Sequence, residues 1–361
     1  MSVQVSSDAL MASYGLLVVM LTVPQFVLIH HHLHLLVMAP LLVWIGCQRA
    51  LLESQKAPGE SQVETVSKRD ALRFPLVGSA VLFGLFIVIK LVNKEYLDIL
   101  ISVYFTGLGS FGLFGTVQGP ITKAFKAEQL PRWSKDFHWQ FWKKRENSEP
   151  ISISCSGLDV VVYLLCAGIA IAYGITKKWW LNNLLGSAFA VQGIEMLSLG
   201  SYIIGCLLLT GLFFYDIFWV FGTQVMVAVA KGLDAPIKIL FPKALGVKPL
   251  PLSMLGLGDI VIPGIFVAMM LRFDAKQACA WARRHGLVNT PYFHANMVGY
   301  VLGLALTVAV MHVFDAAQPA LLYLVPACIG SSIITAVLRG ELKTLLNFSE
   351  EKAEDKDSKT D

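Results

Sequence analysis

Two stretches, GLFFYDIFWVFGT (residues 211–223) and MLGLGDIVIPGIFVAMML (residues 254–271), each place one aspartate inside an otherwise apolar run. Asp216 belongs to a longer apolar segment, residues 202–230, and Asp259 has no basic residue close to it in the sequence. Because an ionised carboxylate is costly in hydrocarbon, such residues face the interior of a helix bundle or a wet cavity. Two of them on consecutive helices predict a shared functional site within a membrane.

The composition is typical of a membrane protein. Of the 361 residues, 55% are hydrophobic and only 15% are charged, and the mean hydropathy is +0.63. The apolar residues form blocks of about 20, the length that crosses a bilayer core. These blocks predict an all-α polytopic membrane protein with segments at roughly 10–29, 33–52, 73–92, 96–117, 158–176, 179–199, 201–225, 253–271, 293–314 and 319–338.

The first two blocks leave the number of spans open. Only a histidine-rich string, residues 31–34, divides them, and no charged residue intervenes. We expect one true span there, with the other part a tilted extension or a re-entrant piece, which gives nine spans. Two separate spans are the alternative.

The distribution of basic residues predicts the orientation. With nine spans and the N-terminus outside, 21 of the 29 Lys and Arg residues fall in segments on the cytosolic side. Cytosolic loops are enriched in Lys and Arg, so we expect a cytosolic C-terminus. The count does not fix the N-terminus, because a chain of ten spans would begin inside.

Four parts are expected along the chain. The link between the two aspartate-bearing helices, residues 231–252, contains four prolines and is predicted to be stiff and to lie at the membrane interface. The end of the chain is charged and poor in apolar residues, which is typical of disorder. The parts are an N-terminal membrane segment with a cytosolic loop (1–72), an N-terminal helical bundle (73–200) with a basic cytosolic loop (118–157), the helices that carry the two aspartates (201–340) and an acidic disordered cytosolic tail (341–361).

Two carboxylates close together in a low-dielectric site share one proton and titrate as a pair. The ionised member can take a proton from water while the protonated member polarises a carbonyl, as in aspartic proteases, and this chemistry needs no metal or other cofactor. For the pair to meet at one depth, we expect the helix of Asp216 to end before Ala230. Tyr215, beside Asp216, is either a packing aromatic or a side chain whose hydroxyl reaches the site.

Glycine and proline flank the second aspartate. Gly256 and Gly258 allow close approach of a backbone and leave room for an extended substrate strand. Pro263 loosens the helix after Asp259. Since a helical substrate hides its peptide bonds, we expect exposed backbone here to pair with an unwound substrate.

Several of the polar residues in the apolar segments also have a purely structural interpretation. A single intramembrane aspartate can be a structural hydrogen-bonding group or part of an ion path. We expect Glu195 to hydrogen-bond with Gln192 or Ser198 rather than to belong to a wet cavity. The group of His30, His31, His32 and His34 is interpreted as an interfacial cluster rather than a metal site. The six cysteines occur singly, without metal or redox spacing, and are interpreted as packing residues.

Three short motifs occur along the chain: Tyr215-Asp216, Gly256-Leu257-Gly258-Asp259 and Gln318-Pro319-Ala320-Leu321. Their order resembles that of the YD, GxGD and PAL motifs of intramembrane aspartyl proteases. The flanking strings FFYDIFWVFGT, LFP and QPALLYLVPACIG are similar to the signal peptide peptidase family, and the resemblance runs from about residue 73 to 340. The joint occurrence of these motifs is far more specific than GxGD alone.

The resemblance implies a presenilin-like bundle of nine transmembrane helices in the endoplasmic reticulum membrane, with the N-terminus lumenal and the C-terminus cytosolic. It implies that Asp216 and Asp259 are the catalytic pair, and that Pro319, Ala320 and Leu321 pack against the site and help to admit substrate. The implied substrates are transmembrane helices in type II orientation, mainly signal-peptide remnants. The end of the chain, KDSKTD, has no dilysine signal for retrieval to that membrane.

We therefore predict an intramembrane aspartyl endopeptidase whose partners are transmembrane-helix peptides and the lipid bilayer, with no nucleic acid. Self-association into a homo-oligomer is left open. One rival is a proton- or cation-coupled transporter or channel that uses the carboxylate pair, and another is a non-proteolytic scaffold for misfolded helices. A protease alone requires both aspartates for peptide cleavage.

Overall fold

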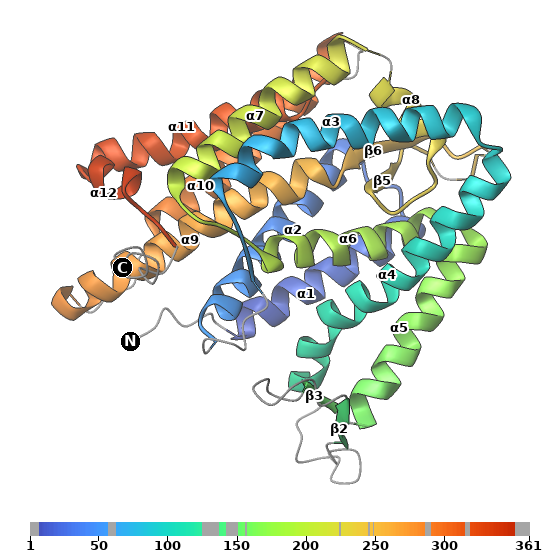
Figure 1. Cartoon of the computed structure of the whole chain (residues 1–361), viewed down its shortest axis with the longest axis horizontal. Helices are drawn as coiled ribbons and strands as arrows, with labels where there is room; N and C mark the ends of the chain where they lie inside the picture. The colour runs from blue at the N-terminus through green and yellow to red at the C-terminus, as the bar shows by residue number, and fades with distance from the viewer. Residues whose placement is uncertain are drawn as a thin grey trace, which may run out of the picture.

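Long apolar segments in this chain fold as helices because, in lipid, each backbone N–H and C=O must be satisfied within the segment. A computed structural model describes residues 7–56, 63–124, 137–141, 151–155, 157–223, 225–244, 246–247, 249–285, 290–314 and 318–350. The helices (Figure 1) are α1 (Ser7–Thr22), α2 (His31–Ser54), α3 (Lys68–Leu91), α4 (Lys94–Ala124), α5 (Gly157–Thr176), α6 (Trp179–Met196), α7 (Tyr202–Phe221), α8 (Val225–Gly232), α9 (Gly258–His285), α10 (Pro291–Phe314), α11 (Leu321–Arg339) and α12 (Leu342–Leu346).

Each of the ten predicted apolar segments contains most or part of a long helix, so the all-α polytopic class is confirmed. The segments predicted at 179–199 and 253–271 also include short strands, at residues 197–199 and 252–256. Within the described residues, eight helices are long and apolar enough to cross a membrane: α1 with the short 3₁₀ turn after it, α2, α3, α4, α5, α7, α10 and α11. The expected total of nine is not confirmed. Nor is the single span in residues 10–52, because α1 and α2 are separate helices that pack against each other and both qualify.

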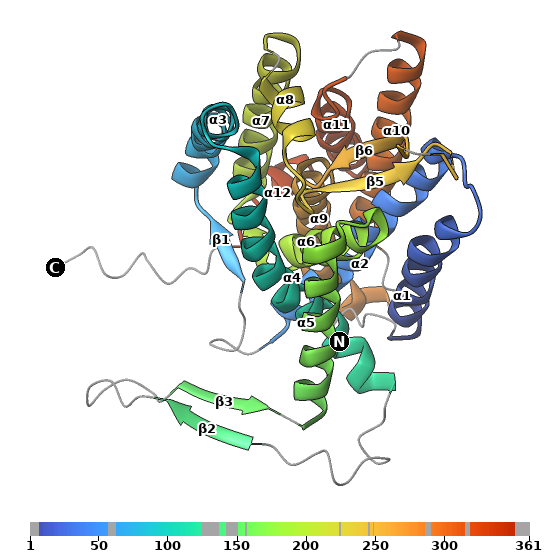
Figure 2. The same ribbon diagram turned by 90° about the vertical axis from the view of Figure 1, so that its right-hand side faces the viewer.

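The centre of the bundle is formed by α2, α6 and α9. A Cβ added at Gly46 of α2 would lie 2.8 Å from Cβ of Ile194 in α6, and one added at Gly264 of α9 would lie 2.5 Å from Cδ1 of the same side chain. The Cys47 thiol donates to the Gly264 carbonyl at 3.6 Å. Glycine therefore allows three backbones to meet around one isoleucine. The N-terminal part of the chain supplies a core helix (Figure 2).

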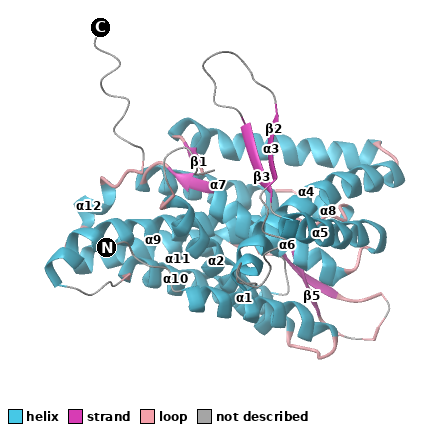
Figure 3. Cartoon of the chain, turned by 90° about the horizontal axis from the view of Figure 1, so that it is seen from below, coloured by secondary structure: helices cyan, strands magenta, loops and turns pink. Residues whose placement is uncertain are grey.

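Short strands, which the sequence did not predict, connect the helices (Figure 3). The described residues contain three two-stranded sheets, of which β1–β4 is parallel and the other two are antiparallel. The link expected at 231–252 contains the end of α8 and the whole of β5, while its position at the membrane interface stays a prediction. The strands are β1 (Glu64–Val66), β2 (Phe137–Phe141), β3 (Ile151–Cys155), β4 (Leu197–Leu199), β5 (Lys238–Pro242) and β6 (Leu252–Gly256).

Glu195 has a different partner from the one expected. Its carboxylate forms an ion pair with Arg49 of α2 at 2.7 Å, and the same guanidinium donates to the backbone carbonyls of Gly115 and Thr116 in α4 at 2.9 and 2.8 Å. The prediction of a hydrogen bond with Gln192 or Ser198 is therefore wrong. The sequence could not show that Arg49, 146 residues away, is brought to the same place.

The predicted disordered tail needs correction for residues 341–350, since 351–361 lie outside the described residues. Phe348 packs on Phe273 of α9, and its carbonyl accepts from the Tyr202 N–H at 3.2 Å. Glu350 forms a buried ion pair with Arg272 at 2.8 Å and accepts from the Ser198 hydroxyl. This C-terminal clasp, residues 347–350, ties the end of the chain to α7, α9 and β4.

The buried Arg272–Glu350 ion pair generates a prediction about stability. Glu350→Ala leaves an uncompensated guanidinium in a dry site, and we expect it to lower the free energy of unfolding by about 3 kcal/mol. The measurement is unfolding in mixed micelles by titration with a denaturing detergent. Arg339→Ala, which breaks an exposed pair with Glu341, is the control and should cost less than about 1 kcal/mol. Equal effects of the two changes would contradict a stabilising clasp.

Candidate active site

Asp216 lies in the last third of α7, which ends at Phe221, before Ala230 as expected. Its side chain is only 3% exposed, and its Oδ2 accepts a hydrogen bond of 3.0 Å from the Leu321 N–H. Leu321 is the first residue of α11. The first N–H groups of a helix have no partner within the helix and carry partial positive charge. The start of α11 therefore supplies a donor that suits a carboxylate.

The PAL motif forms the turn that aims this donor. Pro319, Ala320 and Leu321 are buried, and Ala320 is the N-cap residue of α11. The Pro319 carbonyl accepts from the Leu322 N–H at 3.2 Å, which closes the turn. A proline fixes the backbone ahead of the helix and needs no hydrogen-bond acceptor of its own. The motif thus holds α11 with its first N–H directed at Asp216.

Asp259 lies at the junction of a strand and a helix. It is the second residue of α9, directly after the hairpin formed by β5 and β6, and it is partly exposed. The Leu257 N–H continues the strand pairing by donating to the Ile237 carbonyl at 3.0 Å, while the Leu257 carbonyl accepts from the Val261 N–H at 2.8 Å. Leu257 therefore joins the strand pairing to the first turn of the helix. These two bonds fix the position of the backbone just before Asp259.

The two aspartates lie on neighbouring helices, since α7 packs against α9, and α11, whose first N–H bonds to Asp216, packs against both. Gly256 lies beside the pair: a Cβ added there would be 3.3 Å from Oδ2 of Asp259. Gly258 is exposed, and a Cβ there would meet only the Ile262 side chain at 3.9 Å. The first glycine therefore leaves space for the carboxylate, and the second leaves the backbone open.

Tyr215 contacts the neighbouring helix α3. A Cβ added at Gly78 of that helix would lie 3.6 Å from the Tyr215 ring, and the ring centroid is 6.4 Å from that of Trp219. The Trp219 indole N–H donates to the Ser79 hydroxyl at 3.0 Å. These contacts give Tyr215 a packing role between α7 and α3, in addition to its place next to Asp216.

The hydrogen-bond pattern of the hairpin shows which backbone groups point outward at its two edges. Besides the bond from Leu257 to Ile237, the Lys243 N–H donates to the Pro251 carbonyl at 2.9 Å. Hydrogen-bonded pairs alternate along an antiparallel ladder. Given the register of β5 and β6, odd-numbered residues of the two strands bond to each other, and even-numbered residues direct their N–H and C=O groups outward.

The outer edge of β5 is covered by two asparagines of α6. The Asn183 side chain makes two bonds of 2.7 Å to Leu240, accepting from its N–H and donating to its carbonyl. Asn182 donates to the Lys238 carbonyl at 2.7 Å. Both asparagines are buried. An asparagine amide that bonds both groups of one residue takes the place of a neighbouring strand, so this edge is closed.

The outer edge of β6 is open. The outward backbone groups belong to Leu252, Met254 and Gly256, and the part of the chain that the structure describes pairs no strand with them. The Met254 side chain is 42% exposed. An unpaired edge strand is a template for another extended chain. Strand β6 ends at Gly256, three residues before Asp259.

Sequence reasoning missed Asn183 and one further side chain of the site, Tyr300 of α10. The Tyr300 hydroxyl lies 3.4 Å from the Asp259 backbone carbonyl, and the side chain is fully buried. Two adjacent asparagines inside an apolar block were an available signal for the first. Tyrosines occur in many apolar segments of this chain, so no signal in the sequence would single out Tyr300.

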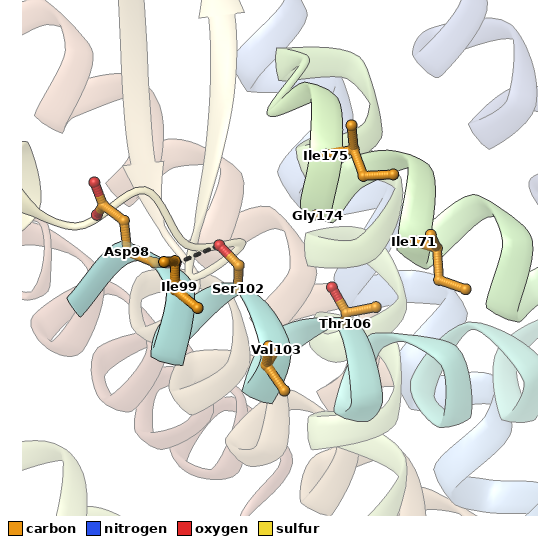
Figure 4. A pocket seen from close by; sticks show the side chains of 8 residues that line it. All are labelled: Asp98, Ile99, Ser102, Val103, Thr106, Ile171, Gly174 and Ile175. Atoms are coloured by element: carbon orange, nitrogen blue, oxygen red, sulfur yellow. Dashed lines mark hydrogen bonds between the residues drawn. The ribbon is translucent and has the colours of Figure 1, made fainter. Parts of the chain in front are cut away.

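Other clusters lie apart from the aspartates. A groove of about 410 Å³ between α4 and α5 is lined by residues such as Asp98, Thr106 and Gly174, and neither Asp216 nor Asp259 reaches it (Figure 4). The rings of His31 and His32 lie 3.9 Å apart at the start of α2. Among the described residues, no group of histidine, cysteine and acidic side chains has the arrangement of a metal site.

Comparison with known proteins gives consistent matches. Residues 59–352 match the family model described as signal peptide peptidase. The chain is 40% identical to signal peptide peptidase of Mus musculus over 331 residues, which covers 91% of this chain and 85% of the mouse protein. It is 40% identical to the Homo sapiens protein of the same name over 325 residues, 89% and 84% of the two chains. It is 48% identical to intramembrane protease 2 of Caenorhabditis elegans over 216 residues, 58% and 46% of the two chains.

The role of Asn183 can be tested directly. Asn183→Leu keeps the approximate shape of the side chain but leaves two backbone groups of Leu240 unpaired, at about 1–3 kcal/mol each. We expect faster amide hydrogen exchange in β5 and β6, measured by mass spectrometry in detergent micelles.

The control for that experiment is Asn296→Leu in α10. The Asn296 amide is fully buried and has no hydrogen-bond partner within the described residues, so its loss leaves no backbone group unpaired. We expect hairpin exchange at the wild-type rate. Wild-type exchange in Asn183→Leu as well would show that α6 does not hold the hairpin.

Proposed function

The chain belongs to the signal peptide peptidase family of intramembrane proteases, and we propose that it is an aspartyl endopeptidase with Asp216 and Asp259 as its catalytic pair. The observation that carries the proposal is the packing of α7 against α9, which places the buried Asp216 and the partly exposed Asp259 on neighbouring helices. Such a pair can run acid and base chemistry without a metal.

The hydrogen bond from Leu321 supports a division of roles. An N–H at the start of a helix suits a negative charge, so we assign Asp216 as the group that takes a proton from the attacking water. Asp259 then donates its proton to the carbonyl oxygen of the substrate, giving a gem-diol. In the second half, the proton on Asp216 passes to the amide nitrogen as the C–N bond breaks, and Asp259 recovers its proton from a hydroxyl.

The open edge of β6 supports a mode of substrate binding. Peptide bonds in a helix are buried in intrahelical hydrogen bonds, so a transmembrane substrate must become extended before water can attack. Strand addition to a free edge gives main-chain hydrogen bonds that hold such a segment. We propose that the substrate pairs with Leu252, Met254 and Gly256 and so presents the next peptide bonds to Asp259.

The substrate class and cellular location complete the proposal. We propose transmembrane helices of type II orientation, chiefly signal-peptide remnants, cleaved in the endoplasmic reticulum membrane by a chain with a lumenal N-terminus and a cytosolic C-terminus. Nine spans, an N-terminal helical bundle in residues 73–200 and catalytic helices in 201–340 belong to the same proposal. The distribution of basic residues supports the orientation of the C-terminus.

The test of the catalytic pair is cleavage of a synthetic signal-peptide helix by the purified protein in detergent. Asp216→Ala and Asp259→Ala should each abolish product, and the double variant should lose little more than either one, because residues that act as a unit are not additive. Asp274→Asn is the matched control. Asp274 is a buried aspartate of α9 that accepts from the Phe293 N–H, and Asn keeps an acceptor there.

The alternatives give different results in that assay. Equal cleavage by wild type and by both aspartate variants would reject the catalytic assignment. Ion flux into proteoliposomes that Asp→Asn changes abolish, without cleavage, would favour a transporter or channel. Peptide binding that survives loss of either aspartate, again without cleavage, would favour a scaffold.

The open edge of β6 gives a separate prediction. Met254→Pro removes an outward N–H without touching the bonds to β5, and proline is tolerated on edge strands. Losing one substrate hydrogen bond of about 0.5–1.5 kcal/mol should lower kcat/KM by about two- to ten-fold. Met254→Ala removes only the side chain and is the control. Equal activity of the two variants would exclude strand addition at this edge.

A further inference from the structure

The carbonyl of Asp259 has lost its normal partner within α9. In an α-helix, the carbonyl of residue i accepts from the N–H of residue i+4. Residue 263 is a proline, which has no N–H. The first turn of α9 therefore begins with an acceptor that the helix itself cannot satisfy, on the residue that carries a proposed catalytic carboxylate.

The Tyr300 hydroxyl occupies the place of that missing donor. It lies 3.4 Å from the Asp259 carbonyl oxygen, and the Tyr300 side chain has no exposed surface. A buried carbonyl without a partner is costly, and a buried tyrosine hydroxyl seeks an acceptor. Each group satisfies the other, across the interface between α9 and α10.

The residues next to Tyr300 fix α10 against α11. A Cβ added at Gly299 would lie 2.8 Å from the Ala327 carbonyl oxygen, and one at Gly303 would lie 3.1 Å from the Tyr323 carbonyl oxygen. The two glycines, one turn apart, thus allow close backbone contact with the helix whose first N–H bonds to Asp216. The α10–α11 pair reaches both aspartates, through Leu321 to one and through Tyr300 to the other.

We propose that Tyr300 is a positioning residue for the dyad: its hydroxyl replaces the hydrogen bond that Pro263 removes and so fixes the first turn of α9 and the direction of the Asp259 carboxylate. This inference rests on the proposed function. It assigns Tyr300 no contact with substrate. Pro263 leaves the first turn of α9 without one backbone hydrogen bond. Tyr300, which α11 holds in place through α10, supplies the bond that fixes the position of this turn.

The test is a double-mutant cycle in the full chain with the cleavage assay. Tyr300→Phe removes only the hydroxyl, and we expect kcat to fall by about five- to ten-fold with KM within about two-fold of wild type. Pro263→Ala restores an N–H at the position that normally serves the Asp259 carbonyl. In that background, Tyr300→Phe should change kcat by less than about two-fold, because the helix supplies the bond itself.

The matched control is Tyr202→Phe in α7, whose buried hydroxyl bonds to the Ser332 hydroxyl at 2.8 Å, and it should leave kcat unchanged. An equal loss from Tyr300→Phe in both backgrounds, or no loss in the wild-type background, would overturn the inference. A Tyr300→Phe protein that folds and cleaves only with Pro263→Ala supports it, and failure to fold in both backgrounds overturns it. Asp259→Ala that still cleaves would instead reject the proposed function.

Discussion

The constraint on which this structure depends is the cost of an unpaired backbone group away from water. A site that opens peptide bonds to attack needs strand and turn inside a bundle of helices, and each of those irregular groups needs a partner. Here the partners are side chains and helix ends from elsewhere in the chain. Asn183 bonds to one edge of the hairpin, the Tyr300 hydroxyl donates to the Asp259 carbonyl, and the first N–H of α11 donates to Asp216. The outer edge of β6, for which the described residues supply no partner strand, is the exception.

These partnerships explain why distant parts of the sequence form one centre. The carboxylate of Asp216 is fixed by a residue 105 positions later, and the hairpin before Asp259 is held by a helix 57 positions earlier. The glycines of α2, α9 and α10 let the helices approach closely enough for bonds of this length. The site is therefore a property of the packed bundle rather than of the motifs alone.

The sequence shows part of this arrangement and hides the rest for physical reasons. Both aspartates can be identified from the sequence because a charged residue in an apolar run is evident from its immediate neighbours. The ten long helices can be identified because the length of an apolar run is also evident from neighbouring residues. The hairpin does not, because prolines and lysines interrupt its alternation in residues 231–252. The partners of Glu195, Asp259 and Glu350 are decided by tertiary packing, so an ion pair with Arg49, a bond from Tyr300 and a folded tail could not be predicted from neighbours in the sequence.

The C-terminal clasp bears on the order of events during synthesis. Both aspartates leave the ribosome long before Leu321, and Leu321 leaves before Glu350, which joins Ser198 and Arg272. A nascent chain that has inserted α7 and α9 thus holds two carboxylates without the donor that orients one of them or the clasp that ties their helices. The centre can therefore be completed only after residue 350 has been synthesised, and until then the growing chain carries two carboxylates in an unfinished site.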